Sequence, residues 1–96
     1  MGAEVFIDEG SGETAQDAFA TLTRQARYNY GHAGYTGTIG EKHGYTMIPL
    51  PEGEDAQTYA GELIDGSDSR VDDKWGPAGC IDLGDGKFLF FGWASC

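Results

Sequence analysis

The feature that most constrains the fold is an apolar segment near the C-terminus that a single turn signal interrupts. Residues 80–83 and 87–93 are rich in strand-forming residues, and Gly-Asp-Gly separates them at 84–86. Asp-Gly suits a two-residue turn of the primed type, which joins neighbouring antiparallel strands. The sequence therefore predicts a β-hairpin whose second strand belongs to the core. That strand supplies four large aromatic residues: Phe88, Phe90, Phe91 and Trp93.

A second strong pattern predicts a helix of about 15 residues. Its apolar residues recur at intervals of three and four, which places them on one helix face: Ala15, Ala18, Phe19, Leu22 and Ala26. Thr14 with Asp17 resembles a capping box, so the helix should start there, and Gly31 can end it. The opposite, solvated face would carry Gln16, Thr23 and Arg27.

Weaker patterns predict the remaining elements. Residues 5–7 read as a first strand, while 35–39 and 45–48 read as a central hairpin around the turn 40–44. Ala56, Tyr59, Ala60 and Leu63 fit a shorter second helix that ends at Gly66. Residues 67–79 form a polar, Asp-rich loop.

Together these elements predict one α+β domain that spans residues 1–96. A chain of 96 residues is long enough for one hydrophobic core and too short for two. The expected order is β-α-β-β-α-β-β, a mainly antiparallel sheet of four to five strands with two helices on one face.

The same sequence predicts a soluble, cytoplasmic chain. The longest apolar run, Phe88 to Phe91, is far below the roughly 20 residues that span a bilayer, and the N-terminus has no basic stretch typical of a secretory signal. Cys80 and Cys96 are therefore expected to remain thiols in a reducing compartment.

The net charge of −10 restricts the class of partner. Sixteen acidic residues face six basic ones, so the chain should repel nucleic acid and anionic membranes, and a charged partner should be a basic protein. The acidity is concentrated in residues 4–17, with −5, and in residues 52–73, with −7.

The second acidic stretch is the predicted partner-binding site. Its carboxylates would steer association, and Tyr59 and Trp75 would be the anchors. The carboxylates are Glu52, Glu54, Asp55, Glu62, Asp65, Asp68, Asp72 and Asp73. The plainer interpretation is a solvated face that only keeps the domain soluble.

No motif in the sequence indicates catalysis, a metal or another cofactor. The serines lie outside any G-x-S-x-G elbow, and His32, His43 and the two cysteines lack the spacing of a zinc site. Residues 65–72 lack the sixth-position glycine of a calcium loop. We therefore expect a protein that is not an enzyme and binds no cofactor.

The glycine-rich region from Gly34 to Gly40 supports an alternative function. Its backbone amides, with Tyr35 or Tyr45, could hold a small molecule such as a nucleotide, because glycine lets the backbone approach an anion closely.

The same region carries a resemblance. The stretch Gly34-Tyr-Thr-Gly-Thr-Ile-Gly-Glu-Lys42, which follows Ala26-Arg-Tyr-Asn-Tyr-Gly31, resembles a pattern of small uncharacterised bacterial and phage proteins. In size, charge and lack of catalytic motifs the chain is similar to phage-encoded inhibitors of host defence, including anti-CRISPR proteins that imitate DNA. This resemblance of type implies an inhibitor that blocks a basic nucleic-acid-binding surface of a host defence complex.

Overall fold

A computed structural model describes residues 2–30 and 36–96 of the chain. The elements follow one another in this order: β1 (Ala3–Ser11), α1 (Ala15–Tyr30), a short 3-10 helix (Ile39–Glu41), β2 (Tyr45–Met47), α2 (Ala56–Asp65), β3 (Ala78–Gly84) and β4 (Lys87–Ser95).

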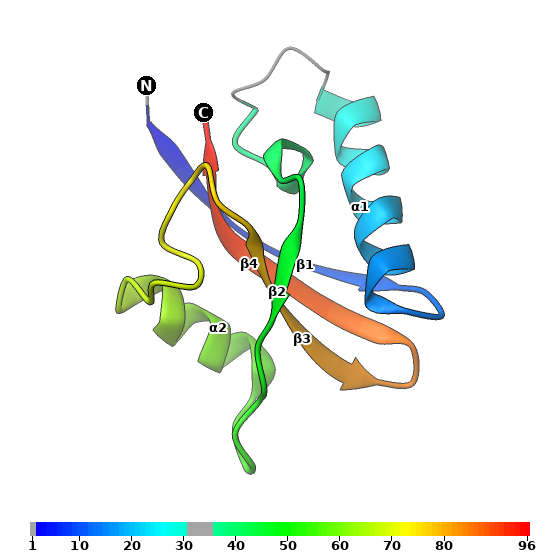
Figure 1. The fold of residues 1–96 in the computed structure, drawn as a ribbon, viewed down its shortest axis with the longest axis vertical. Coiled ribbons are helices and arrows are strands. Elements are labelled where there is room, and N and C mark those ends of the chain that lie inside the picture. The colour runs from blue at the N-terminus through cyan, green and yellow to red at the C-terminus, as the bar shows by residue number, and fades with distance from the viewer. Residues whose placement is uncertain (1, 31–35) are drawn as a thin grey trace.

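The four strands form one mixed sheet in the order β1-β4-β3-β2 (Figure 1). β4 runs antiparallel to both β1 and β3, and β2 runs parallel to β3. The predicted α+β class and the number of strands are confirmed. β1 and β2 are the two edge strands.

The two helices cover opposite faces of the sheet, so the prediction that both lie on one face is wrong (Figure 1). Alternate residues of β4 point to different sides: Phe88 and Phe90 pack with α1, whereas Leu89 and Phe91 pack with α2. An unbroken apolar run is typical of a strand that is buried on both faces. The apolar run from Phe88 to Phe91 therefore indicates a strand that is covered on both faces of the sheet.

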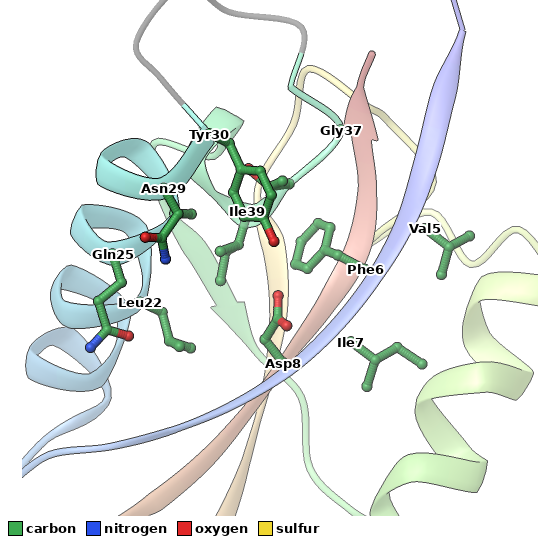
Figure 2. A pocket seen from close by; sticks show the side chains of 12 residues that line it. Val5, Phe6, Ile7, Asp8, Leu22, Gln25, Asn29, Tyr30, Gly37 and Ile39 are labelled. Carbon is green, nitrogen blue, oxygen red and sulfur yellow. The ribbon is translucent and has the colours of Figure 1, made fainter.

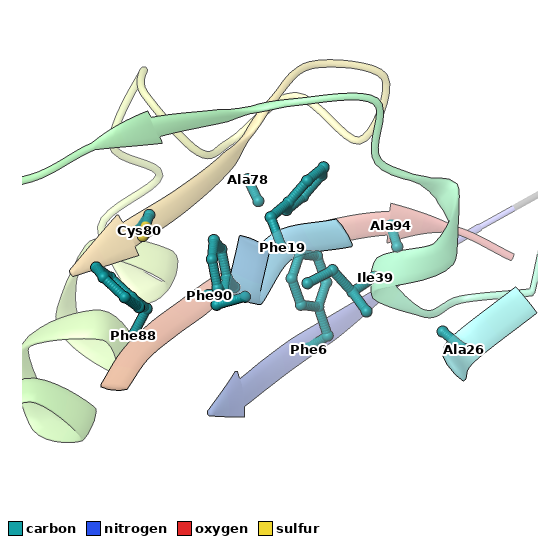
Figure 3. Packing of buried hydrophobic residues seen from close by; sticks show 10 residues of the cluster. Phe6, Phe19, Ala26, Ile39, Ala78, Cys80, Phe88, Phe90 and Ala94 are labelled. Atoms are coloured by element: carbon teal, nitrogen blue, oxygen red, sulfur yellow. The ribbon is translucent and has the colours of Figure 1, made fainter. Parts of the chain in front are cut away.

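The core consists of two clusters, one on each side of the sheet. The α1-side cluster contains Phe6, Ala18, Phe19, Ala26, Ile39, Ala78, Cys80, Phe88, Phe90 and Ala94 (Figure 3). The α2-side cluster contains Ile48, Ala60, Ile64, Val71, Ile81, Leu89 and Phe91. Gly79 makes the second cluster possible, because a Cβ there would lie 2.7 Å from Phe91 Cζ and 2.8 Å from Val71 Cγ1.

The C-terminal hairpin has the predicted turn. Asp85 and Gly86 take φ angles of 55° and 74°, which is the positive-φ pair of a primed two-residue turn.

Helix α1 begins as predicted, because Thr14 Oγ1 accepts a hydrogen bond from the Asp17 amide at 3.2 Å. Thr23 is a correction: it is buried, and its hydroxyl donates to the Phe19 carbonyl at 2.9 Å within the helix. This internal bond satisfies the hydroxyl without water. The cap expected at Gly31 lies outside the described residues.

The predicted central hairpin does not form. In the described part of segment 35–39 the chain leads into the 3-10 helix, where Arg27 Nε donates to the Gly40 carbonyl at 3.1 Å. β2 pairs instead with β3, 33 positions later in the chain, with Tyr45 opposite Ala78. Tyr35 lies outside the described residues.

Helix α2 and its end are confirmed. The helix runs from Ala56 to Asp65, and Gly66 is its C-terminal cap.

Candidate functional site

The predicted partner-binding residues lie on α2 and on the chain segments around it. We call them the acidic face, defined as Glu52, Glu54, Asp55, Tyr59, Glu62, Asp65, Asp68, Asp72, Asp73 and Trp75. Most of their side chains are exposed; Tyr59 and Asp68 are partly buried. The structure thus leaves this charge in contact with water.

Three of the eight carboxylates are engaged locally. Asp55 caps α2 by accepting from the Thr58 amide at 3.0 Å. Asp68 accepts two bonds from the Arg70 guanidinium, at 2.9 and 3.0 Å. Asp73 Oδ1 accepts from the Trp75 amide at 2.8 Å. These carboxylates stabilise a helix end and a loop, so they are less free to meet a partner. The other five are exposed: Glu52, Glu54, Glu62, Asp65 and Asp72.

Arg70 also changes the role expected of Tyr59. Its hydrogen bonds lower the pKa of Asp68 to about 2, while Asp68 and then Tyr59 raise the pKa of Arg70. The Tyr59 ring packs against the α2-side cluster. Tyr59 therefore lies at the edge of the acidic face, with its ring against the core and in contact with Arg70.

Trp75 is exposed, and a residue that the sequence did not reveal holds its loop. Lys42 is 1% exposed, and its Nζ donates to the carbonyls of Asp73, Lys74 and Gly76 at 3.2, 3.3 and 2.9 Å. Burial lowers the pKa of Lys42, and the charge of Asp73 opposes this shift. No local pattern marks Lys42, because its partners lie 31 to 34 positions away.

The Trp75 side chain is 61% exposed on this fixed loop. Lys74 Nζ lies 5.4 Å from the centre of the indole ring, within the range of a cation–π contact, and also donates to the Gly2 carbonyl at 3.3 Å. The loop therefore presents a large aromatic surface in one defined position.

A cleft of about 380 Å³ lies on the other side of the sheet, between β1, α1 and the segment before the 3-10 helix (Figure 2). We call it the α1–β1 cleft. It is lined by Val5, Phe6, Ile7, Asp8, Leu22, Gln25, Ala26, Asn29, Tyr30, Gly37, Thr38 and Ile39. In Figure 2 the Asp8 side chain points from β1 into this space, and Val5 and Ile7 point away from it.

Asp8 is the one acidic residue that lines the described part of this cleft. Its side chain is half-buried, and burial raises the pKa of its carboxyl group. Within residues 2–30 and 36–96, no group donates a hydrogen bond to this carboxylate. The sequence had placed Asp8 only within an acidic stretch, since burial of a single strand residue depends on what packs above it.

In the described part of the Gly34–Gly40 region, three backbone amides that the nucleotide hypothesis would use already donate hydrogen bonds within the chain. The Thr36 amide donates to Glu41 Oε2 at 3.2 Å, the Gly37 amide to the Ser95 carbonyl at 2.7 Å, and the Gly40 amide to Thr38 Oγ1 at 3.2 Å. The Tyr45 ring packs against both Phe19 and Phe90 in the core. Gly34 lies outside the described residues.

Other chemistry-bearing groups are dispersed. Cys80 and Cys96 are free thiols, one buried and one exposed, and burial followed by the charge of Asp82 raises the pKa of Cys80 to about 12. Such a thiol is a poor nucleophile at neutral pH. Across the described ranges, no three His, Cys, Asp or Glu side chains are grouped to hold a metal ion.

No helix in the described chain is long and apolar enough to cross a membrane.

Comparisons with protein-family models, with curated proteins and with solved structures gave no match for this chain.

Proposed function

We propose that this chain is a non-enzymatic binding protein that covers a basic, nucleic-acid-binding surface of another protein. The partner is a host defence complex, in keeping with the resemblance of type to phage-encoded, DNA-imitating inhibitors. The contact surface is the acidic face, with Trp75 as its aromatic anchor.

The observation that carries this proposal is the fixed presentation of Trp75. An exposed tryptophan on a loose loop would lose conformational entropy on binding, whereas the Lys42 ammonium already fixes the carbonyls on both sides of this residue. Tryptophan is enriched among residues that dominate binding energy. A side chain that is held in place and 61% exposed is suited to that role.

The exposed carboxylates would supply steering rather than most of the affinity. Charges at the rim of an interface mainly raise the association rate, and salt screens them. We assign this steering to Glu52, Glu54, Glu62, Asp65 and Asp72, because the other three carboxylates are bound within the acidic face.

The test is affinity capture from a bacterial lysate, identification of any stoichiometric partner, and competition by duplex DNA. We expect DNA to compete, and the affinity to fall steeply between 50 and 300 mM salt, on the order of tenfold or more. Asp65→Lys with Asp72→Lys should weaken binding about tenfold, and Trp75→Ala by a similar factor.

The matched control is Glu9→Lys with Glu13→Lys. This pair makes the same change in net charge at exposed positions outside the acidic face. Equal losses of affinity in the two double variants would show that binding depends only on net charge, and this would contradict a specific contact through the acidic face. Unchanged binding of the Asp65/Asp72 variant, or failure of DNA to compete, would overturn the proposal.

A further inference from the structure

The α1–β1 cleft contains a carboxylate whose charge nothing in the described chain balances. Asp8 is half-buried, and no described donor hydrogen-bonds to it. Carboxylates that leave bulk water are normally paired or hydrogen-bonded, because an unpaired one destabilises the native state. A native protein that keeps such a group in front of a 380 Å³ space has room there for a partner of opposite charge.

The lining of the cleft indicates the shape of that partner. Phe6, Leu22 and Ile39 provide apolar surface, and the side chains of Gln25, Asn29 and Tyr30 provide hydrogen-bond acceptors and an aromatic ring. A flexible aliphatic stem packs well on apolar surface while its charged head reaches polar groups. An ammonium or guanidinium head can also lie against an aromatic ring.

The charges around the cleft favour a cation further. Glu4 lies at its rim, since a Cβ on Gly37 would be 2.9 Å from Glu4 Cγ. Helix α1 ends at Tyr30, so its carbonyl end adds partial negative charge there. Arg27 is committed elsewhere, because its Nε donates to Gly40 and its Nη2 to Lys42. Anionic ligands such as phosphates would meet net repulsion.

One structural role competes with a binding role for Asp8. β1 is an edge strand, and charged residues that point inward on edge strands prevent two sheets from pairing edge to edge. Edge protection alone would not call for an open cleft with an apolar floor in front of the carboxylate. The two roles also predict different behaviour when the charge is removed.

We propose that the α1–β1 cleft binds an alkylguanidinium or alkylammonium group. Its head pairs with the Asp8 carboxylate, and its stem lies on Phe6, Leu22 and Ile39. The group comes either from a small free cation or from an arginine or lysine side chain of a polypeptide. This site is independent of the acidic face, which belongs to the opposite side of the sheet.

The test is an NMR titration of the full chain with arginine amide, and with citrulline amide as its uncharged isostere. Arginine amide should shift the amide signals of residues 6–8, 25–29 and 37–39 in a saturable way. Citrulline amide should bind about tenfold or more weakly, because a charged hydrogen bond in a partly dry site outweighs a neutral one. Equal binding of the two compounds, or no shifts at 20 mM, would overturn the proposal.

Two isosteric variants assign the effect to Asp8. Asp8→Asn should weaken arginine amide binding about tenfold or more, whereas Glu9→Gln, which removes the neighbouring exposed charge on β1, should change it less than about twofold. Equal losses of affinity in the two variants would mean that net charge alone attracts arginine amide, and this would overturn the proposed site. If Asp8→Asn instead forms dimers in sedimentation and binds arginine amide like the wild type, Asp8 is an edge-protecting charge and the binding site is refuted.

Titration with an arginine-containing peptide distinguishes the two possible sources of the cation. Acetyl-Gly-Gly-Arg-Gly-Gly-amide that binds about tenfold tighter than arginine amide assigns the cleft to a polypeptide side chain. Equal or weaker binding of the peptide assigns it to a small free cation.

Discussion

The acidic face and the α1–β1 cleft use carboxylates in opposite ways. The acidic face has many, and each is either exposed or bonded to a neighbour, as Asp68 is to Arg70. The cleft has Asp8, which is half-buried and without a described donor. The pKa of Asp68 is lowered to about 2 by Arg70, whereas the pKa of Asp8 is raised by loss of water.

This difference shows that a high density of surface charge does not by itself mean that a carboxylate gains much from binding one specific cation. Water already stabilises an exposed carboxylate, so adding more of them to a surface creates a field but little need for a specific contact. A carboxylate that has lost part of its hydration gains more from one well-placed cation. The acidic face is suited to attraction over distance, and the cleft to recognition of a single group.

The largest expected effect comes from Lys42→Met, which would break the acidic face and spare the cleft. Three carbonyls of residues 73–76 would lose their donor, so the free energy of unfolding should fall by about 1–3 kcal/mol. Denaturant unfolding measures this loss, and NMR relaxation should show greater mobility at Trp75. Lys87→Met, at an exposed lysine, is the control. A stability loss equal to that of the control would contradict the role assigned to Lys42.

A smaller effect of opposite sign is expected from Asp8→Asn. The folded-state pKa of Asp8 lies above the unfolded value, so the ionised form destabilises the native state at neutral pH. The variant should be more stable at pH 7 by an amount below about 1 kcal/mol, because the group is half exposed. The gain should shrink as the pH falls below the folded-state pKa and should vanish below the unfolded value of 3.8.

Denaturant unfolding between pH 3 and 7 measures this dependence, with Glu9→Gln as control. A variant that is less stable than the wild type at pH 7 would show that Asp8 has a stabilising partner in the native protein.

The smallest effect is expected from Asp68→Asn on the acidic face. The folded-state pKa of Asp68 is about 2, below the unfolded value of 3.8, so the pair with Arg70 stabilises above pH 4, and this contribution is lost as the pH falls from about 4 to 2. The pair is exposed to solvent and salt, which limits the loss to a few tenths of a kcal/mol. Asp65→Asn is the matched control. Thermal unfolding at low and high salt measures the difference, and a loss that salt does not reduce would contradict a screened surface pair.

Of the candidate sites, the sequence located the acidic face and missed the cleft. The eight carboxylates of residues 52–73 and Trp75 are visible as a local run, and the structure leaves most of them exposed. The sequence did not reveal that Arg70 binds Asp68 and interacts with Tyr59. Asp8 was indistinguishable from its acidic neighbours, because only the packing of α1 above β1 removes part of its water.

The sequence by itself determined the elements whose causes lie within a few residues. Thr14 caps α1, Gly66 ends α2, and Asp85-Gly86 turns the hairpin, because a cap or a tight turn is complete within about four residues. The tertiary structure alone decided the parallel pairing of β2 with β3, the placement of the helices on opposite faces and the burial of Lys42. Each of these features depends on contacts between segments that are distant along the chain. Such contacts stabilise the fold only when the whole sheet has formed, so a local sequence pattern does not reveal them.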